Sequence, residues 1–397
     1  MAHIPTSAAR RALAAALLCG ASLWLAACGD SGPGPGEMIS SKSISAPTGV
    51  TASSANYLIT YRIRGVAGDF RDEKAVVLIP GGTAPSGGYP VIAWGHGTTG
   101  DADICAPSAS ADLAQYGAYL NQYLAQGYAV VAPDYEGLGT PGGHPYLHVP
   151  SEGQAMVRAV QAAKAGFASL SSRWAAVGHS QGGQAALAAA EYAGLATGMS
   201  FVGTVAFAPA SNVETIGDQL RAAADNPSAP IPDRIAAGTG AVGFGALILG
   251  GVQAVSPSFQ FSSALGTAGA GLEDSVNTKC LNDVFADAQA AVTAAITSSN
   301  SLESVLKASW KTDPAVSAYL PLMEPGTKQL SAPTLLIQGT ADTTVPATAT
   351  QALLARMQGL GSTVTYSEKA GSTHSSIIVD GIVDALGFLA TRFAATP

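Results

Sequence analysis

The sequence has few charged residues for its length. Lysine and arginine number 19 and aspartate and glutamate 27 among 397 residues, so charged side chains make up 12% of the chain, about half the usual share. Apolar residues reach 47%, which is enough for a large core and excludes a disordered chain. The formal net charge is −8, and no cluster of basic residues occurs. Both facts argue against a nucleic-acid-binding protein.

Cysteine is also rare, with four residues in the chain. Cys19 lies in an apolar run that follows Arg10-Arg11, and Cys28 follows the small residues Ala26-Ala27. This combination resembles the signal peptide of bacterial lipoproteins, and the apolar run is short for a membrane span. We therefore expect a signal peptide over residues 1–27 and a lipid anchor on Cys28.

Glycine follows the proposed lipid-anchored cysteine, at Gly29, which in this resemblance favours the outer membrane over the inner one. The alternative is an ordinary secretory signal with an incidental cysteine, which would give a secreted or periplasmic protein. The next segment is rich in glycine, proline and serine, as in Gly32–Gly36. We expect residues 28–56 to form a flexible tether between the anchor and the folded domain.

The two remaining cysteines are Cys105 and Cys280. In an exported protein, two such cysteines most simply form one disulfide. The alternative is a pair of free buried thiols.

Apolar runs alternate with helical patterns along most of the chain. Continuous apolar strands separated by helices indicate an α/β fold with a mainly parallel sheet covered on both faces. The alternation stops between residues 211 and 330, which predicts a helical cap inserted between two parts of the core, 57–210 and 331–397. The expected strands are Tyr57–Arg64 at an edge, Ala75–Pro80, Val91–Trp94, Tyr128–Pro133, Trp174–Val177, Phe201–Ala208, Pro333–Gln338 and Thr363–Ser367. The expected core helices are Asp112–Gln126, Ser151–Phe167, Gln184–Ala193, Thr348–Gln358 and Ser375–Phe393.

One stretch of the predicted cap, Ile235–Pro257, contains no charged residue. Its many glycines and its position in the middle of an exported domain favour a buried helix or a lid against the active site. A membrane span is the alternative. The lack of polar atoms would suit an acyl chain.

A serine stands in the segment Gly178–Gly183, whose pattern Gly-x-Ser-x-Gly is typical of a nucleophile elbow in α/β-hydrolases. The segment follows an apolar strand and precedes an alanine-rich helix, as that motif requires. Gly178 and Gly182 would let the strand and the helix approach each other closely, because a Cβ atom there would clash. We therefore expect Ser180 to be the nucleophile.

A nucleophilic serine needs a histidine base and an acid that orients the histidine. In α/β-hydrolases the chain order is serine, acid, histidine. Of the six histidines, only His374 follows Ser180, and it lies in the loop after the last strand. Asp342 follows the strand that ends at Gln338, in a loop typical of the acid. The alternative for Asp342 is a simple turn or helix-capping aspartate.

Two backbone amides are needed to stabilise the oxyanion. The amide of Gln181 is one candidate, and the early loop supplies the other, with Thr98 favoured and Gly97 next. His179 is not expected to be the base, because neighbouring side chains on a strand point to opposite faces. His96 is expected to order the oxyanion loop.

A metal site is the alternative role of His144, His148 and Glu152, which have helical spacing. Pro145 and Pro150 would break a continuous helix there, so no metal and no cofactor is expected.

Four segments together resemble the secretory lipase family. They are Gly95–Gly100, Cys105–Ser108, Tyr128–Gly137 and Gly178–Gly183. The resemblance implies an α/β-hydrolase core, a large helical cap, a catalytic triad of Ser180, Asp342 and His374, and hydrolysis of fatty-acid esters. It also implies a disulfide between Cys105 and Cys280.

We accordingly expect an exported serine hydrolase that cleaves carboxylic esters, such as acylglycerols, through an acyl-enzyme. It would act as a monomer, associated with a membrane through its lipid anchor. The triad alone leaves open a serine peptidase of the same fold, since both reactions are acyl transfers. A third hypothesis, from another functional class, is a catalytically inactive protein of this fold that binds a partner at the cell surface.

Overall fold

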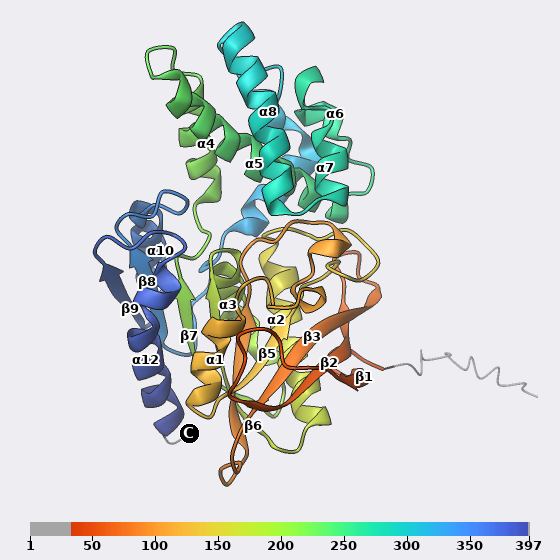
Figure 1. The fold of residues 1–397 in the computed structure, drawn as a ribbon, viewed down its shortest axis with the longest axis vertical. Helices are drawn as coiled ribbons and strands as arrows, with labels where there is room; N and C mark the ends of the chain where they lie inside the picture. The colour runs from red at the N-terminus through yellow and green to blue at the C-terminus, as the bar shows by residue number, and fades with distance from the viewer. Residues whose placement is uncertain (1–32, 396–397) are drawn as a thin grey trace, which may run out of the picture. The chain divides into compact units, whose positions relative to one another are not determined.

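A nine-stranded sheet runs through residues 33–395, which are the part of the chain that the computed structural model describes (Figure 1). The predicted signal peptide and Cys28 lie outside the described residues. The strands lie in the order β1-β2-β3-β5-β4-β6-β7-β8-β9. They are β1 (Met38–Ser43), β2 (Ser53–Arg64), β3 (Phe70–Pro80), β4 (Tyr89–Gly95), β5 (Ala129–Pro133), β6 (Leu170–His179), β7 (Ser200–Phe207), β8 (Thr334–Gly339) and β9 (Val364–Lys369).

The sheet is antiparallel at one side and parallel from β5 to β9. β1, β2, β3 and β5 pair antiparallel in turn, whereas β4 pairs in parallel with β5 and β6, and β7, β8 and β9 continue in parallel. The mostly parallel sheet predicted from the apolar runs is therefore confirmed. Every residue of β5 and β8 is buried, as expected for strands that are covered on both faces.

Helices cover both faces of this sheet (Figure 1). Val131 of β5 packs in one buried cluster with Met156 of helix α2 (Val149–Gly166). Its neighbour Val130 packs on the other face with Leu120 of α1 (Gly117–Ala125) and Leu389 of α12 (Ile382–Ala394). The core helices are α1 (Gly117–Ala125), α2 (Val149–Gly166), α3 (Gln181–Glu191), α10 (Ala347–Gly359), α11 (Ile377–Asp380) and α12 (Ile382–Ala394). Short 3₁₀ helices are η1 (Asp103–Cys105), η2 (Pro107–Ala109) and η3 (Ala193–Leu195).

The tether predicted over residues 28–56 is wrong from residue 38 onward. Met38–Ser43 forms β1, which pairs with β2, so β1 and not the predicted strand Tyr57–Arg64 is the edge of the sheet. β1 is rich in serine and mostly exposed, with Met38 packed against the core. This strand is held mainly by backbone hydrogen bonds to β2, so its sequence has no alternation of apolar side chains from which a strand could be predicted.

Two predicted helices also differ in their bounds. The helix expected over Asp112–Gln126 begins only at Gly117, because the three residues Leu113–Gln115 have positive φ angles of 54°, 53° and 74°. The helix expected over Ser375–Phe393 is divided into α11 and α12 at Gly381. A Cβ atom on Gly381 would lie 2.7 Å from the Ile337 side chain, so the chain packs closely against the sheet at this point.

A group of helices between β7 and β8 forms a separate layer at the top of Figure 1. These helices are α4 (Val213–Ala224), α5 (Ile231–Val255), α6 (Phe261–Ala264), η4 (Thr267–Gly269), α7 (Leu272–Thr278), α8 (Leu281–Ser299), η5 (Trp310–Thr312), α9 (Pro314–Tyr319) and η6 (Leu320–Met323). They enclose their own apolar cluster, which includes Leu247, Val292 and Val305. We call this layer the cap.

Helix α5 crosses the centre of the cap. Within residues 33–395 it is the one helix long and apolar enough to cross a membrane by length and composition, and 67% of its most apolar window is buried in the protein. Its neighbours α4 and α8 pack against it, and Leu247 and Leu249 are buried. This burial agrees with the buried helix predicted over Ile235–Pro257.

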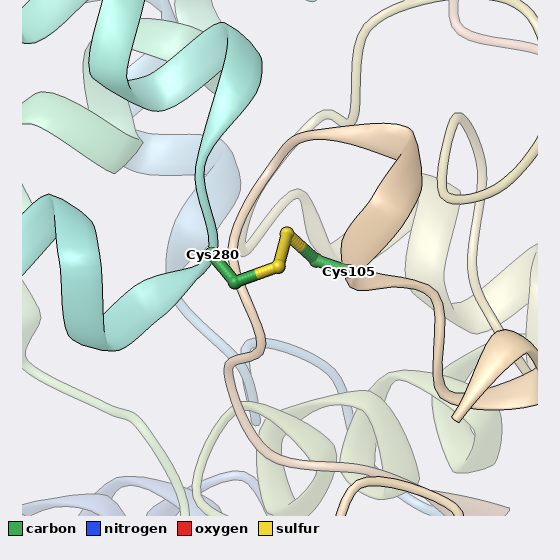
Figure 2. Close-up of a disulfide and its surroundings, with 2 residues drawn as sticks. All are labelled: Cys105 and Cys280. Atoms are coloured by element: carbon green, nitrogen blue, oxygen red, sulfur yellow. A yellow bond between two sulfur atoms is a disulfide. The ribbon is translucent and has the colours of Figure 1, made fainter. Parts of the chain in front are cut away.

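A disulfide between Cys105 and Cys280 joins the core to the cap (Figure 2). Cys105 ends η1 in the core, and Cys280 directly precedes α8 in the cap. Their Cα atoms are 5.4 Å apart. The amide of Leu281 also donates a hydrogen bond to the carbonyl oxygen of Thr99 at 2.9 Å. The start of α8 is therefore attached to the loop after β4 by a covalent bond and a hydrogen bond.

Candidate active site

Ser180 lies at the sharp turn between β6 and α3. Its φ of 59° and ψ of −121° are strained for a residue with a side chain. Two glycines make this turn possible. A Cβ atom on Gly178 would overlap the carbonyl oxygen of Gly182, and one on Gly182 would overlap that of Gly95 in β4. The close approach of strand and helix thus lifts Ser180 to the carboxyl end of the sheet.

Three side chains from separate loops form a continuous hydrogen-bonded row. The Nε2 atom of His374 lies 2.9 Å from the Oγ of Ser180, and its Nδ1 lies 2.7 Å from the Oδ2 of Asp342. Asp342 follows β8 and His374 follows β9, so both loops leave the sheet at its carboxyl edge. A neutral His374 protonated on Nδ1 would donate to Asp342 and could accept a proton from Ser180.

Asp342 is held in one orientation. Its Oδ1 accepts hydrogen bonds from the amides of Thr344 and Val345 at 2.8 and 2.9 Å, and its Oδ2 also accepts from the Nε2 of Gln338 at 3.2 Å. Burial alone would raise the pKa of Asp342, but His374 and the two amides outweigh burial and lower it below the ordinary value. The carboxyl group is therefore an anion at neutral pH.

Two backbone amides near Ser180 have no partner among residues 33–395. The amide of Gln181 begins α3, and that of Thr98 lies in the loop after β4; neither donates to another atom of this part of the chain. The amide of Gly97 differs, because it donates to the Oη of Tyr116 at 3.2 Å. The geometry thus favours Thr98 over Gly97 as a second oxyanion donor. The hydroxyl of Thr98 is 2.8 Å from that of Tyr146.

The side chain of Gln181 is buried and held by two hydrogen bonds. Its Nε2 donates to the Nε2 of His144 at 3.0 Å and to the Oε1 of Glu152 at 2.8 Å. Burial raises the pKa of Glu152 to about 8 and lowers that of His144 to about 3, so both groups are neutral at pH 7. These two residues position the start of α3.

His148 does not join this pair. Its Nδ1 accepts the amide of Ser151 at 3.3 Å, and it caps the start of α2. Across residues 33–395, no group of three or more metal-binding side chains is found.

His96 is buried next to the loop that carries Gly97 and Thr98. Its Nδ1 lies 2.8 Å from the carbonyl oxygen of Gly97, and its Nε2 lies 3.3 Å from that of Asp134. Its ring stacks on that of Tyr135 with centroids 4.2 Å apart. Burial lowers the pKa of His96 to about 4, so the ring is neutral at pH 7. These contacts match the ordering role expected for it.

Two residues that make hydrogen bonds next to the proposed triad, His179 and Tyr116, were not predicted from the sequence to have a role in the site. The Nδ1 of His179 lies 3.0 Å from the Oη of Tyr116, and its Nε2 lies 2.8 Å from the carbonyl oxygen of His374. His179 is adjacent to Ser180, which is a signal that the sequence offers. Tyr116 lies 64 residues before Ser180 in a segment without a motif, so no sequence signal identifies it.

Ser180 borders two different hollows. One is an apolar pocket under the cap, whose walls include Ile216, Leu220, Phe244, Ile248, Trp310 and Leu320. The other is a more open cleft along the loop after β4 and the start of α8, whose walls mix polar and apolar side chains and include the disulfide. The two hollows share Ser180, Phe244 and Thr344. A substrate whose reacting carbon lies at Ser180 could therefore extend in two directions.

Comparison with known proteins gives a family match and related folds. The family model described as secretory lipase matches residues 108–397. A search of curated protein sequences finds no relative of this chain. Several solved structures are similar over almost the whole chain.

The rice cell wall degrading esterase LipA from Xanthomonas oryzae is 21% identical, with a TM-score of 0.69, and the match covers 91% of this chain and 100% of that chain. Candida antarctica lipase A in its closed state is 18% identical, with a TM-score of 0.70 and coverages of 92% and 84%. A hydrolase of Legionella pneumophila, described only in general terms, is 15% identical, with a TM-score of 0.71 and coverages of 91% and 100%. These likenesses confirm the predicted α/β-hydrolase fold.

Proposed function

Since the match over residues 108–397 shows that this chain belongs to the secretory lipase family and is a carboxylic ester hydrolase, we propose that Ser180 is its nucleophile. The single observation that supports this best is the row of hydrogen bonds from Ser180 through His374 to Asp342, at 2.9 and 2.7 Å. Nucleophile, base and orienting acid are the groups that acyl transfer from an ester requires.

In the first half of the reaction, Ser180 attacks the ester carbonyl carbon while His374 takes the hydroxyl proton on Nε2. The negative charge of Asp342 stabilises the imidazolium that forms. His374 then gives the proton to the leaving alkoxide, the alcohol departs and the acyl group stays on Ser180. In the second half, water attacks the acyl-enzyme with His374 again as the base, which releases the acid and restores Ser180.

The amides of Gln181 and Thr98 donate to the oxyanion of each tetrahedral intermediate. Removing one such donor typically lowers turnover by about 10²–10³-fold. The hydrogen bonds of Gln181 to His144 and Glu152 hold its backbone in place before substrate arrives. Preorganised donors are effective because they need no rearrangement during the reaction.

The substrate is an ester of a fatty acid, such as an acylglycerol. The apolar pocket under the cap suits the acyl chain, and the more open cleft of mixed polarity, which also borders Ser180, suits the alcohol. The names of the similar structures, an esterase and a lipase, agree with this class of substrate.

Export and lipid anchoring are part of the proposal. The secretory lipase family suggests export, and a disulfide between Cys105 and Cys280 is compatible with an oxidising compartment. We propose that Cys28 carries the lipid and anchors the protein to the outer membrane. Mass spectrometry of the N-terminal peptide from the mature protein would test this, and an unmodified Cys28 would contradict it.

The test of the nucleophile is Ser180→Ala, assayed on short p-nitrophenyl esters. We expect hydrolysis to fall about 10⁶-fold, to background, because no other group forms the acyl-enzyme. Ser171→Ala is a matched control, since this buried serine lies at the opposite end of the same strand and accepts the Arg173 amide at 3.1 Å.

The control should keep its activity, even if loss of the Arg173 hydrogen bond lowers its melting temperature by a few degrees. A fluorophosphonate probe should label the wild type at Ser180, which would exclude an inactive binding protein. Comparing ester and peptide substrates of the same acyl group separates an esterase from a peptidase. Hydrolysis by Ser180→Ala at the wild-type rate would refute the proposal.

A further inference from the structure

His179, next to Ser180, takes part in a row of three hydrogen bonds that the proposed chemistry does not use. The row runs from the amide of Gly97 to the Oη of Tyr116 at 3.2 Å, and from Tyr116 to the Nδ1 of His179 at 3.0 Å. It then runs from the Nε2 of His179 to the carbonyl oxygen of His374 at 2.8 Å. The row therefore connects the loop of the proposed oxyanion donor to the loop of the proposed base.

The direction of each hydrogen bond follows from the chemistry of the atoms. A carbonyl oxygen only accepts, so the Nε2 of His179 must carry a proton and donate to His374. In a neutral ring the Nδ1 is then an acceptor, and the hydroxyl of Tyr116 donates to it. The oxygen of Tyr116 is left free to accept the Gly97 amide. All three bonds are satisfied by one protonation state and one tautomer.

The surroundings keep His179 in that state. The side chain is 7% exposed, and its ring centroid lies 4.8 Å from that of His374. Burial and, to a smaller extent, the neighbouring His374 lower the pKa of His179 to about 3. His179 therefore stays neutral while His374 alternates between its neutral and charged forms.

We propose that His179 is a positioning residue that, together with Tyr116, aligns the base loop with the oxyanion loop. This inference rests on the proposed function of Ser180 and His374. His179 holds the backbone of His374 directly, and it holds the amide of Gly97, next to Thr98, through Tyr116. Both loops are thereby held in position relative to β6, the strand that ends at His179 directly before Ser180. The side chain cannot serve as the base, since its Nε2 already carries a proton and its one acceptor, Nδ1, takes the hydroxyl of Tyr116.

The test compares three variants: His179→Phe, Tyr116→Phe and the double variant. His179→Phe keeps an aromatic ring but removes both nitrogens, and Tyr116→Phe removes one hydroxyl. We expect kcat per active site, counted with a fluorophosphonate titrant, to fall about 10- to 100-fold in His179→Phe, because misplacement of about 1 Å can cost that much. KM should change little, since neither residue binds the acyl chain.

Tyr119→Phe is the matched control. Both Tyr116 and Tyr119 pack against Trp94 with ring centroids 5.1 Å apart, but the hydroxyl of Tyr119 bonds to Tyr123 and takes no part in the row. The control should keep the wild-type kcat. Tyr116→Phe should lower kcat, and the loss in the double variant should be smaller than the product of the two single losses, because both substitutions break the same row. Multiplied effects, or a kcat of His179→Phe equal to the control, would overturn the proposal.

A spectroscopic measurement separates this proposal from the proposed function. In protein labelled with ¹⁵N-histidine, the signals that His179→Phe removes should be those of a neutral ring protonated on Nε2. In Tyr116→Phe, the Nδ1 signal of that ring should shift while the Nε2 signal stays. A ring protonated on Nδ1 would overturn the positioning role, whatever the activity of Ser180→Ala. If His179→Phe does not fold, Tyr116→Phe provides the same two readouts.

Discussion

Replacing Asp342 with asparagine should reverse the hydrogen bond that prepares His374. In the wild type the Oδ1 of Asp342 accepts two amides, those of Thr344 and Val345. The side-chain oxygen of an asparagine must take the same place, because an NH₂ group there would face two donors. The NH₂ group is thus directed at the Nδ1 of His374, where the wild-type Oδ2 accepts at 2.7 Å.

The consequence is the wrong tautomer of His374. An NH₂ group donates, so the Nδ1 of His374 becomes the acceptor and its proton moves to Nε2. His374 then donates to Ser180 and cannot take its proton. The new NH₂ group also faces the Nε2 of Gln338, which donates to the Oδ2 of Asp342 at 3.2 Å in the wild type. Two donors then face each other, and that hydrogen bond is lost. The same exchange in another serine hydrolase family lowers kcat about 10⁴-fold, which corresponds to about 5.4 kcal/mol of transition-state stabilisation.

The assay is kcat on a short p-nitrophenyl ester, with Asp380→Asn as the matched control. Asp380 is an exposed aspartate near the base loop that accepts hydrogen bonds from Ser372 and Ser376 at 2.7 and 2.8 Å. The control should retain its turnover, while Asp342→Asn should lose about four orders of magnitude with little change in KM. A kcat of Asp342→Asn within tenfold of the wild type would refute the reasoning about the tautomer.

Two further predictions concern stability. Replacing Cys105 and Cys280 together with serine should lower the free energy of unfolding, measured by urea titration, by up to about 5 kcal/mol, since the bond closes a loop of 175 residues; an unchanged midpoint would contradict this. The pKa of Glu152 is raised by burial to about 8, so the folded state binds a proton that the unfolded state releases above its ordinary pKa near 4.5. The stabilisation that this bound proton gives the folded state is fully present below pH 4.5, decreases as pH rises, and is gone above about pH 8. The melting temperature should therefore fall between about pH 5 and 8 and level off above it, with a smaller fall in Glu152→Gln. Equal falls in both proteins would exclude Glu152 as the cause.

The sheet was predictable from sequence where its strands are buried on both faces. Apolar runs such as Ala129–Pro133 in β5 and Leu335–Ile337 in β8 predict such strands directly. β1 was not predictable, because its serine-rich residues face solvent and it is held mainly by backbone hydrogen bonds, with Met38 as its one residue packed against the core. The late start of α1 was also not predictable, since leucine, alanine and glutamine do not favour the positive φ angles that Leu113–Gln115 adopt.

The proposed triad was predictable because chain order and strand ends restrict the choice to one histidine and one aspartate. The meeting of Ser180, Asp342 and His374 then follows from the parallel strands that precede them. The supporting residues were harder to find. Glu152 and His144 were weighed as metal ligands, and the structure shows instead that both bind Gln181. Tyr116 had no signal at all, since its role depends on a loop conformation that only tertiary packing creates.

The attachment of the cap limits how it can move. The chain enters the cap after β7 and leaves it before β8, and these two strands are neighbours in the sheet. A body held at two neighbouring points can still rotate about the line between them. The Cys105–Cys280 bond adds a third point, beyond β6 in the loop after β4, and so restricts that rotation. While the bond is intact, the cap can swing as one piece only as far as the loop around Cys105 moves with it.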